Sequence, residues 1–550
     1  MRSGDKSPLT TVFPQKQKAR TGKLAELGYR AWMKIALLTT LLVSSALSQE
    51  WPQYLGPNGN GTAEGRIPVS VQKDGPKTLW KAKIGKGCSS FAISRGRAIT
   101  VGNTNDEDTI WCFDTQSGEI VWKKTYEEKL AAKFYDGGPG ATPTIDGENV
   151  FVLSKSGRLT CHDFKTGDEK WTVDIKKDLK GNMPTWGFSS SPVVYGDLLL
   201  CLPCAKEAAM AALDKATGEV KWQSENTARP GYSAPVFFKH QGNDAALVFH
   251  GRSLVGYDLS KKGEVLFTHG WRTPYDVNAS NPVFHDGLVY LASGYGMGYA
   301  VLDITGGEPK VVHKNPDLRM IFQNAFMVGD DVMGCFGDKN LEAELFRMDL
   351  KSGKILWKHR IPGSRASTAK IGETYVVLSE EGDLVFGEAS EEKFTETGRH
   401  KILHKLCWAP LAIGDGKAFA RTNQGDAVCV DLSAGDSAKA GLRTPLKKKA
   451  EILTVRQSLN ALMTNLEMYK NIGGTYPSQD QGLKALHTKP TSTPRPRRWA
   501  QTLEQGDIKD SWGTSYQYRY PGTRDPSKPE ITSAGPDRKF GTADDLSSQE

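Results

Sequence analysis

The sequence has few cysteines, few histidines and no long hydrophobic run. Its 8 cysteines are spread over 550 residues, and no two of them are adjacent. This spacing is not that of a disulfide framework, so we expect the thiols to pack in the core. The 10 histidines are scattered singly, and no zinc-binding spacing, phosphate-binding loop or Ser-His-Asp pattern stands out. These absences leave no support for hydrolytic or zinc-dependent chemistry.

Positive charge is concentrated at the N-terminus. The formal net charge is +8, but residues 1–48 hold eight Lys and Arg against two Asp and Glu, which leaves only +2 for the rest. A nucleic-acid-binding protein would keep a basic surface, so no nucleic-acid partner is predicted. The length and the 13 tryptophans, 17 tyrosines and 20 phenylalanines favour a large β-rich protein with room for a smaller second domain.

Residues 33–48 have the pattern of a signal peptide. The apolar run 35–43 is too short to span a bilayer, and Ala46 and Ser48 are the small residues that cleavage after Ser48 requires. The 32 residues ahead of this pattern form a long basic leader, so the true start of translation stays open. We therefore predict an exported protein, periplasmic or outside the cell, with no transmembrane span after cleavage.

An aspartate, a Gly-containing turn and a tryptophan eight residues after the aspartate recur along the chain. The complete copies start at Asp114, Asp163, Asp214 and Asp349. Copies that have lost the tryptophan are centred on Asp258, Asp303, Glu388 and Asp431. Successive centres are 39 to 51 residues apart, which is the period of a four-stranded propeller blade.

The residue types of this repeat have physical reasons. Aspartate accepts backbone hydrogen bonds in a tight turn, glycine takes a positive φ, and tryptophan fills the gap between neighbouring blades. The last copy never reaches an outer strand, whereas residues 79–83 form a strand-like segment upstream of the first copy. We predict that this N-terminal strand completes the last blade and closes a ring of eight blades over residues 49–435.

The repeat and the opening segment Trp51-Pro-Gln-Tyr-Leu-Gly-Pro-Asn-Gly-Asn-Gly61 resemble the PQQ-like β-propeller repeat proteins. This resemblance implies a mainly β, eight-bladed propeller. The family holds quinoprotein dehydrogenases, which clamp PQQ with a disulfide between adjacent cysteines, a tryptophan floor and a carboxylate-bound calcium. It also holds non-catalytic members such as the propeller lipoprotein of the outer-membrane β-barrel assembly machinery. Because no cysteines are adjacent here, PQQ is not expected and the non-catalytic class is favoured.

Four polar or aromatic residues stand ahead of predicted inner strands and are candidates for binding a ligand at one mouth of the ring. They are Trp186, Asp276, Asn278 and Trp408. The alternative is packing in turns and between blades, which a propeller needs in any case. The sequence favours packing.

The composition changes after Asp431. Residues 436–446 are rich in Gly, Ala and Ser and are predicted to be a linker. Apolar residues then recur at spacings of three and four up to Gly473, which predicts an amphipathic helix. They are Ile452, Val455, Leu459, Leu462, Leu466 and Tyr469.

The motifs of residues 447–550 resemble the soluble head of the major pseudopilin of type II secretion. They include Tyr476-Pro477, Asp510-Ser-Trp-Gly513 and Ser533-Ala-Gly-Pro-Asp537. The resemblance implies a small α+β head with a long helix and an antiparallel sheet. Neither a prepilin-peptidase motif nor the long apolar helix that packs the filament precedes residue 446. The head is therefore expected to be an accessory to the secretion machinery, or a borrowed domain with another role.

The family's head binds calcium in its last loop, and three carboxylates stand there in this chain. Asp537, Asp544 and Asp545 surround a turn at Gly541, and calcium prefers such oxygen ligands. The alternative is an acidic, solvated turn. A structural calcium ion without a catalytic role is predicted.

These observations predict an exported cell-envelope protein that is not an enzyme. Its propeller would be a scaffold for protein partners of the envelope, including type II secretion components, joined to a calcium-binding head. A PQQ-dependent quinoprotein dehydrogenase is the alternative.

Overall fold

The structure is a computed structural model that describes residues 50–133, 135–339, 341–433, 443–503, 508–535, 538–542 and 544–549, with side chains omitted at 443–454 and 457. The chain divides into two compact units, 1–435 and 436–550. The predicted signal peptide and most of the predicted linker lie outside the described residues. No helix in the described ranges is long and apolar enough to cross a membrane.

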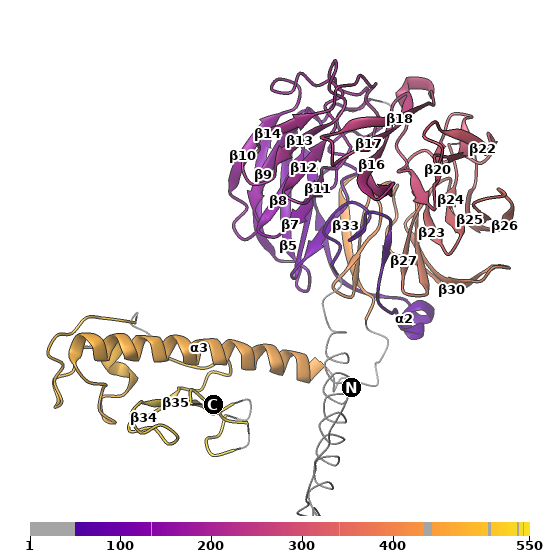
Figure 1. The fold of residues 1–550 in the computed structure, drawn as a ribbon. Helices are drawn as coiled ribbons and strands as arrows, with labels where there is room; N and C mark the ends of the chain where they lie inside the picture. The colour runs from indigo at the N-terminus through magenta and orange to yellow at the C-terminus, as the bar shows by residue number, and fades with distance from the viewer. Residues whose placement is uncertain are drawn as a thin grey trace, which may run out of the picture. The chain divides into compact units, whose positions relative to one another are not determined.

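The first unit is built of antiparallel sheets whose strands pair in chain order (Figure 1). Its first four sheets comprise β3 (Ala92–Ser94), β4 (Arg97–Thr104), β5 (Glu107–Asp114) and β6 (Ile120–Glu127); β7 (Thr144–Asp146), β8 (Asn149–Leu153), β9 (Arg158–Asp163) and β10 (Glu169–Asp174); β11 (Val193–Tyr195), β12 (Leu198–Cys201), β13 (Ala211–Asp214) and β14 (Val220–Gln223); β15 (Val236–His240), β16 (Asn243–His250), β17 (Ser253–Asp258) and β18 (Glu264–Gly270).

The remaining sheets continue the same order. They comprise β19 (Val283–His285), β20 (Leu288–Ser293), β21 (Gly298–Asp303) and β22 (Lys310–Asn315); β23 (Phe326–Val328), β24 (Asp331–Phe336), β25 (Ala343–Asp349) and β26 (Ile355–Ile361); β27 (Ala366–Ile371), β28 (Thr374–Ser379), β29 (Asp383–Ala389) and β30 (Phe394–Lys401); β31 (Ala412–Gly414), β32 (Lys417–Arg421) and β33 (Asp426–Asp431). The described part of the unit thus holds eight sheets of four or five strands in a propeller-like arrangement.

The ends of the ring meet in the last sheet. Strand β2 (Lys77–Lys83) pairs antiparallel with β33, so the sheet order is β2-β33-β32-β31. The first strand of this sheet, β31, also contacts β3 of the first sheet. The predicted pairing of the N-terminal strand with the last repeat is therefore confirmed, and it leaves the last sheet with its fourth strand.

The repeat turns have the conformation that their residue types predict. The Asp114 carboxylate accepts the backbone N–H groups of Gln116 (3.0 Å) and Ser117 (2.9 Å), and Gly118 has a φ of 75°. Asp163, Asp214 and Asp349 accept backbone N–H groups in the same way. The aspartate carboxylate thus accepts hydrogen bonds from backbone N–H groups that would otherwise have no partner within the turn.

Each repeat tryptophan contacts the turn of the next sheet. The Trp122 indole N–H donates to the Phe164 carbonyl over 3.0 Å. A Cβ atom on Gly167 would lie 2.6 Å from the Trp122 ring, so the ring occupies the space that only glycine leaves free. The corresponding bonds are Trp80 to Thr115 (3.1 Å), Trp171 to Lys215 (3.2 Å) and Trp357 to Ser390 (3.0 Å).

A degenerate repeat keeps this contact with a different side chain. His313, on β22, pairs its Nε2 with the Leu350 carbonyl over 2.9 Å and lies against Gly353. An imidazole N–H can replace an indole N–H here because both are planar rings with one donor at the edge. The loss of tryptophan in the sequence therefore does not mean the loss of the contact.

The second unit consists of a helix and a small sheet. The helix α3 (Arg443–Gly473) and the 3-10 turn η3 (Leu483–Leu486) accompany a three-stranded antiparallel sheet of β34 (Gln517–Arg519), β35 (Glu530–Ser533) and β36 (Leu546–Ser547). One core contains the predicted helix stripe from Val455 to Tyr469, together with residues of the sheet.

The helix begins earlier than predicted. It starts at Arg443, inside the segment 436–446 that was predicted to be a linker. The first helical turn has few intrahelical hydrogen bonds and no apolar stripe of its own, so the sequence pattern does not mark it.

Replacing Trp122 with alanine should lower the free energy of unfolding of the first unit by about 3–5 kcal/mol, because it removes a buried ring that joins two sheets. Trp122→Phe keeps most of the ring and should lose about 1 kcal/mol with the hydrogen bond. Urea unfolding followed by circular dichroism measures both. Ile120→Ala, at a half-exposed position of the same strand, is the control and should change little. Equal losses in Trp122→Ala and Ile120→Ala would contradict the role assigned to the indole.

Candidate functional site at the mouth of the ring

The N-terminal segment 51–63 lies against first strands on opposite sides of the ring. Trp51 pairs with Ile93 on β3, and the Pro52 carbonyl accepts the Ile145 N–H of β7 over 2.7 Å. At its other end β1 (Thr62–Ala63) pairs in parallel with β27. Since the first strands converge on the centre of a propeller, this segment occupies part of the central channel.

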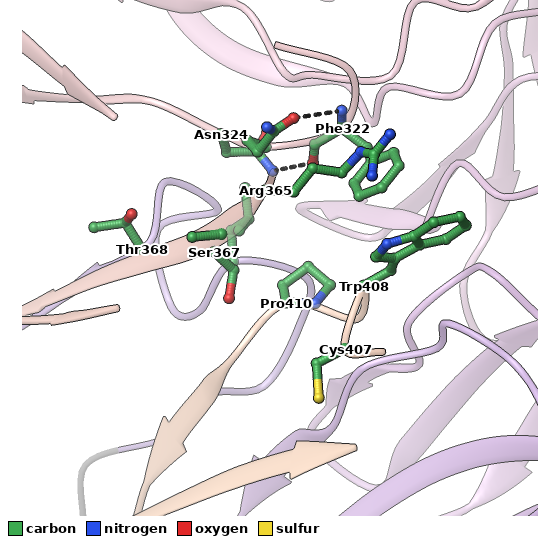
Figure 2. A pocket seen from close by; sticks show the side chains of 11 residues that line it. Phe322, Asn324, Arg365, Ser367, Thr368, Cys407, Trp408 and Pro410 are labelled. Atoms are coloured by element: carbon green, nitrogen blue, oxygen red, sulfur yellow. Dashed lines mark hydrogen bonds between the residues drawn. The ribbon is translucent and has the colours of Figure 1, made fainter. Parts of the chain in front are cut away.

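A pocket lies where this segment meets the loops that precede β23, β27 and β31 (Figure 2). Its volume is about 350 Å³ with the open mouth included. It is lined by Leu55, Phe322, Gln323, Asn324, Arg365, Ala366, Ser367, Thr368, Cys407, Trp408 and Pro410. The Asn324 side chain donates to the Tyr54 hydroxyl over 3.0 Å, which ties the N-terminal segment to the wall.

Trp408 is held at this pocket by a buried ion pair. The Arg365 guanidinium lies 5.3 Å from the Trp408 ring and 5.5 Å from the Phe322 ring, and it bonds the Glu380 carboxylate over 3.1 Å. The Trp408 indole N–H donates to the same carboxylate over 3.3 Å. The side chains of Arg365 and Glu380 are 11% and 10% exposed. Trp408 therefore belongs to a rigid cluster whose charges are paired internally.

Trp186 lies in a second aromatic group. Its ring is 6.1 Å from Tyr232 and 5.9 Å from Tyr275, and Tyr275 is 6.4 Å from Tyr295. The Trp186 indole N–H donates to the Lys133 carbonyl over 3.0 Å. Tyr275 is 66% exposed although its φ of 62° is rare for a bulky residue. Asp276, next along the chain, bonds Arg252 over 2.7 Å.

Asn278 does not line a mouth. It is fully buried, and its amide donates to the carbonyls of His250 (2.8 Å) and Trp271 (3.2 Å). Its role is the packing role that the sequence favoured. Trp186 contacts Tyr275, the residue before Asp276. None of the described contacts joins Trp186 or Asp276 to Trp408.

Sequence reasoning missed three residues of the Trp408 cluster, Phe322, Arg365 and Glu380. Phe322 and Arg365 precede β23 and β27, at the same place in the repeat as Trp186 before β11 and Trp408 before β31. Because all first strands run in the same direction, the segments before them lie at one end of the ring. The same positional rule could have found Phe322 and Arg365, but not Glu380, which pairs with Arg365.

The residues at this end do not match the quinone site that the resemblance implies. Two carboxylates at this end, Asp276 and Glu380, are each bonded to an arginine. A calcium ion there would have to displace a guanidinium from its partner. The chain also has no adjacent cysteines, so it lacks the disulfide clamp of that site.

A buried Cys–His contact provides no nucleophile either. Cys204 Sγ lies 3.5 Å from His250 Nδ1, and His250 Nε2 lies 2.8 Å from the Tyr257 hydroxyl. Burial raises the pKa of Cys204 to about 12 and lowers the pKa of His250 to about 3. Both groups are therefore neutral at physiological pH, and the thiol is unreactive.

The structure describes two of the three predicted metal ligands, the neighbouring residues Asp544 and Asp545 of the C-terminal loop. Gly541 N–H donates to Asp545 Oδ2 over 2.7 Å, and the Thr542 hydroxyl donates to Asp544 Oδ1 over 2.7 Å. Within the part of the loop that the structure describes, Asp545 Oδ1 is buried and has no hydrogen-bond partner, and a cation would satisfy such an oxygen. Asp537 lies outside the described residues. Among the residues that are described, no three His, Cys, Asp or Glu side chains gather as a metal site.

The fold defines the class of the first unit as a PQQ-like propeller. A family model described as outer membrane protein assembly factor BamB matches residues 63–180 and 106–359, more than half of the chain. The chain belongs to this family. A solved structure with a similar fold is the quinohemoprotein alcohol dehydrogenase from Comamonas testosteroni, with a TM-score of 0.52, 13% identity, and coverage of 72% of this chain and 82% of that one. At this identity the likeness concerns the fold alone.

The second unit matches a second family. The model of type II secretion system protein G matches residues 444–549. Core protein G of Pectobacterium carotovorum is 43% identical over 101 residues, 18% of this chain and 64% of its own length. That of Pseudomonas aeruginosa is 38% identical over 100 residues, 18% of this chain and 67% of its own length. The chain thus spans about two thirds of the length of these relatives. The resemblances seen in the sequence are both confirmed.

Replacing Arg365 with methionine should destabilise the first unit by about 3–5 kcal/mol, because Glu380 would stay buried without its cation. Arg365→Met with Glu380→Gln should recover much of this loss, since no unpaired charge is left. Thermal unfolding with tryptophan fluorescence measures both variants. Arg360→Met, which breaks the exposed pair with Glu342, is the control and should change little. A double variant no better than the single one would show that packing, rather than charge pairing, holds the cluster.

Proposed function

We propose that this chain is an exported cell-envelope scaffold without catalytic activity, accessory to type II protein secretion. Its eight-bladed propeller offers a rigid surface to protein partners, and its calcium-binding head engages components of the secretion machinery. The observation that carries the proposal is the presence of both families on one chain, a BamB-like propeller and a protein G domain.

The mouth of the ring supports a binding role rather than a catalytic one. Two of its carboxylates, Glu380 and Asp276, are paired with arginines, and burial raises the pKa of the Cys407 thiol in the pocket to about 12. Exposed aromatic side chains such as Tyr275 and Tyr295 remain. Tyrosine and tryptophan on a rigid frame supply large contact areas with little loss of side-chain entropy, so they suit the centre of a protein interface.

A PQQ-dependent dehydrogenase is the alternative, and the fold of the first unit is what favours it. It would need a carboxylate-bound calcium beside the quinone. When bound, PQQ would accept two electrons from an alcohol or sugar. Asp276 and Glu380 would first have to lose their arginine partners, which makes this alternative the less favoured one.

Binding of the head and redox activity of the ring can be measured on the same protein. Residues 49–550 should bind the major pseudopilin of the same cell in biolayer interferometry, whereas a chain ending at residue 435 should not. Addition of PQQ and calcium should produce no reduction of a redox dye with simple alcohols or sugars. Binding that survives removal of residues 436–550 would contradict the role of the head. Saturable PQQ binding with dye reduction would make the propeller an oxidoreductase.

Calcium should stabilise the head through its last loop. Millimolar calcium is expected to raise the unfolding temperature of the second unit, and a chelator should reverse the effect, because ligand binding favours the folded state. Asp545→Asn should abolish the difference, since it removes the carboxylate whose buried oxygen lacks a partner. Asp525→Asn, in an exposed turn, should leave it unchanged. Calorimetric scans with and without calcium measure the unfolding temperature of the second unit. If the unchanged protein unfolds at the same temperature in both, the head does not bind calcium.

A further inference from the structure

The head carries a segment in which positive charge is concentrated. Residues 481–503 contain five Lys or Arg and no Asp or Glu, although the chain beyond residue 48 has a net charge of only +2. The five cations are Lys484, Lys489, Arg495, Arg497 and Arg498, and all are exposed. None of them forms an ion pair with an acidic residue in the described part of the chain. We call residues 481–503 the basic segment.

The backbone of the basic segment is fixed by hydrogen bonds. The Gln481 amide donates to the carbonyls of Ser492 and Pro494, both over 3.0 Å. The Trp499 indole N–H donates to the Ala485 carbonyl over 3.0 Å, and Arg497 N–H donates to the Gly473 carbonyl over 3.0 Å. The cations therefore project from a loop whose backbone is already ordered, so binding of a partner would cost little conformational entropy of the backbone.

The fold does not need this many cations. Arg497 lies beside Gly474, at the carboxyl end of α3, where one positive charge stabilises the helix dipole. Among the described residues, Lys489, Arg495 and Arg498 make no comparable contact with a helix end, and Arg495 donates to the Thr491 carbonyl within its own loop over 2.8 Å. Five like charges in one stretch repel each other, so their presence points to an anionic partner outside the chain.

We propose that the basic segment is a docking surface for a membrane that contains anionic phospholipids. Exposed Lys and Arg side chains near such a surface attract the negatively charged headgroups without needing a shaped pocket. A single-stranded nucleic acid fits less well, because its bases stack on exposed aromatic rings. The aromatic ring of this segment, Trp499, is half-buried and already hydrogen-bonded. This inference goes beyond the proposed function and does not depend on it.

Vesicle co-sedimentation tests the proposal on residues 49–550. Vesicles of phosphatidylglycerol and phosphatidylcholine should bind the protein at 50 mM NaCl, and pure phosphatidylcholine vesicles should not. Each cation near an anionic surface contributes about a fivefold gain in partitioning. The triple variant Lys489→Gln, Arg495→Gln, Arg498→Gln should therefore bind about 100-fold more weakly. Raising NaCl to 500 mM should release the unchanged protein, because salt screens exposed charges.

A matched variant separates position from net charge. Lys176→Gln, Lys262→Gln and Lys314→Gln remove the same charge from exposed positions of the first unit and should leave vesicle binding unchanged. Equal losses in the two triple variants would overturn the proposal, because binding would then follow total charge. Absence of binding to anionic vesicles, or tighter binding to a polyphosphate or an oligonucleotide than to vesicles, would also overturn it. Circular dichroism spectra verify that both variants are folded.

Discussion

The contact between a tryptophan and the glycine turn of the next sheet is the interaction on which the ring depends. A four-stranded sheet of this length has two apolar faces and cannot bury either of them alone. The indole of Trp122 fills the gap at the rim and hydrogen-bonds to the backbone beyond it. Trp80 makes the same contact across the closure, from β2 to the turn after β5. The ring is therefore joined at its ends in the way it is joined elsewhere.

Closure determines what the mouth of the ring can do. The first strands meet at the centre of the ring. Segment 51–63 and the loops before β23, β27 and β31 therefore lie close together and line one pocket. Arg365 and Glu380 form an ion pair in this pocket, and the Trp408 ring lies against the Arg365 guanidinium. Asp276 and Glu380 each already have an arginine partner, so either carboxylate would have to give up that partner before it could bind a metal ion.

The two families on this chain bring different surfaces. The propeller contributes exposed aromatic side chains on a rigid frame, such as Tyr275. The head contributes a loop fixed by hydrogen bonds, whose exposed cations form no ion pair with any residue that the structure describes. Aromatic surfaces favour protein partners, whereas diffuse positive charge favours an anionic surface.

What the sequence by itself determined is local. The repeat of aspartate, glycine and tryptophan indicates the turn conformations, because its residues lie within ten positions of each other. Its recurrence indicates the period of the blades. The apolar stripe from Val455 to Tyr469 reports a helix for the same reason. The pairing of β2 with β33 could also be predicted from the sequence. One end of the repeat region has a strand without a partner and the other end lacks a strand, so pairing the two closes the ring. Tertiary structure alone decided that Glu380 pairs with Arg365, that His313 replaces a tryptophan, that Asn278 is buried and that residues 51–63 lie in the channel. These outcomes depend on which side chains a closed ring brings within a few ångströms of each other, and no spacing along the chain encodes that distance.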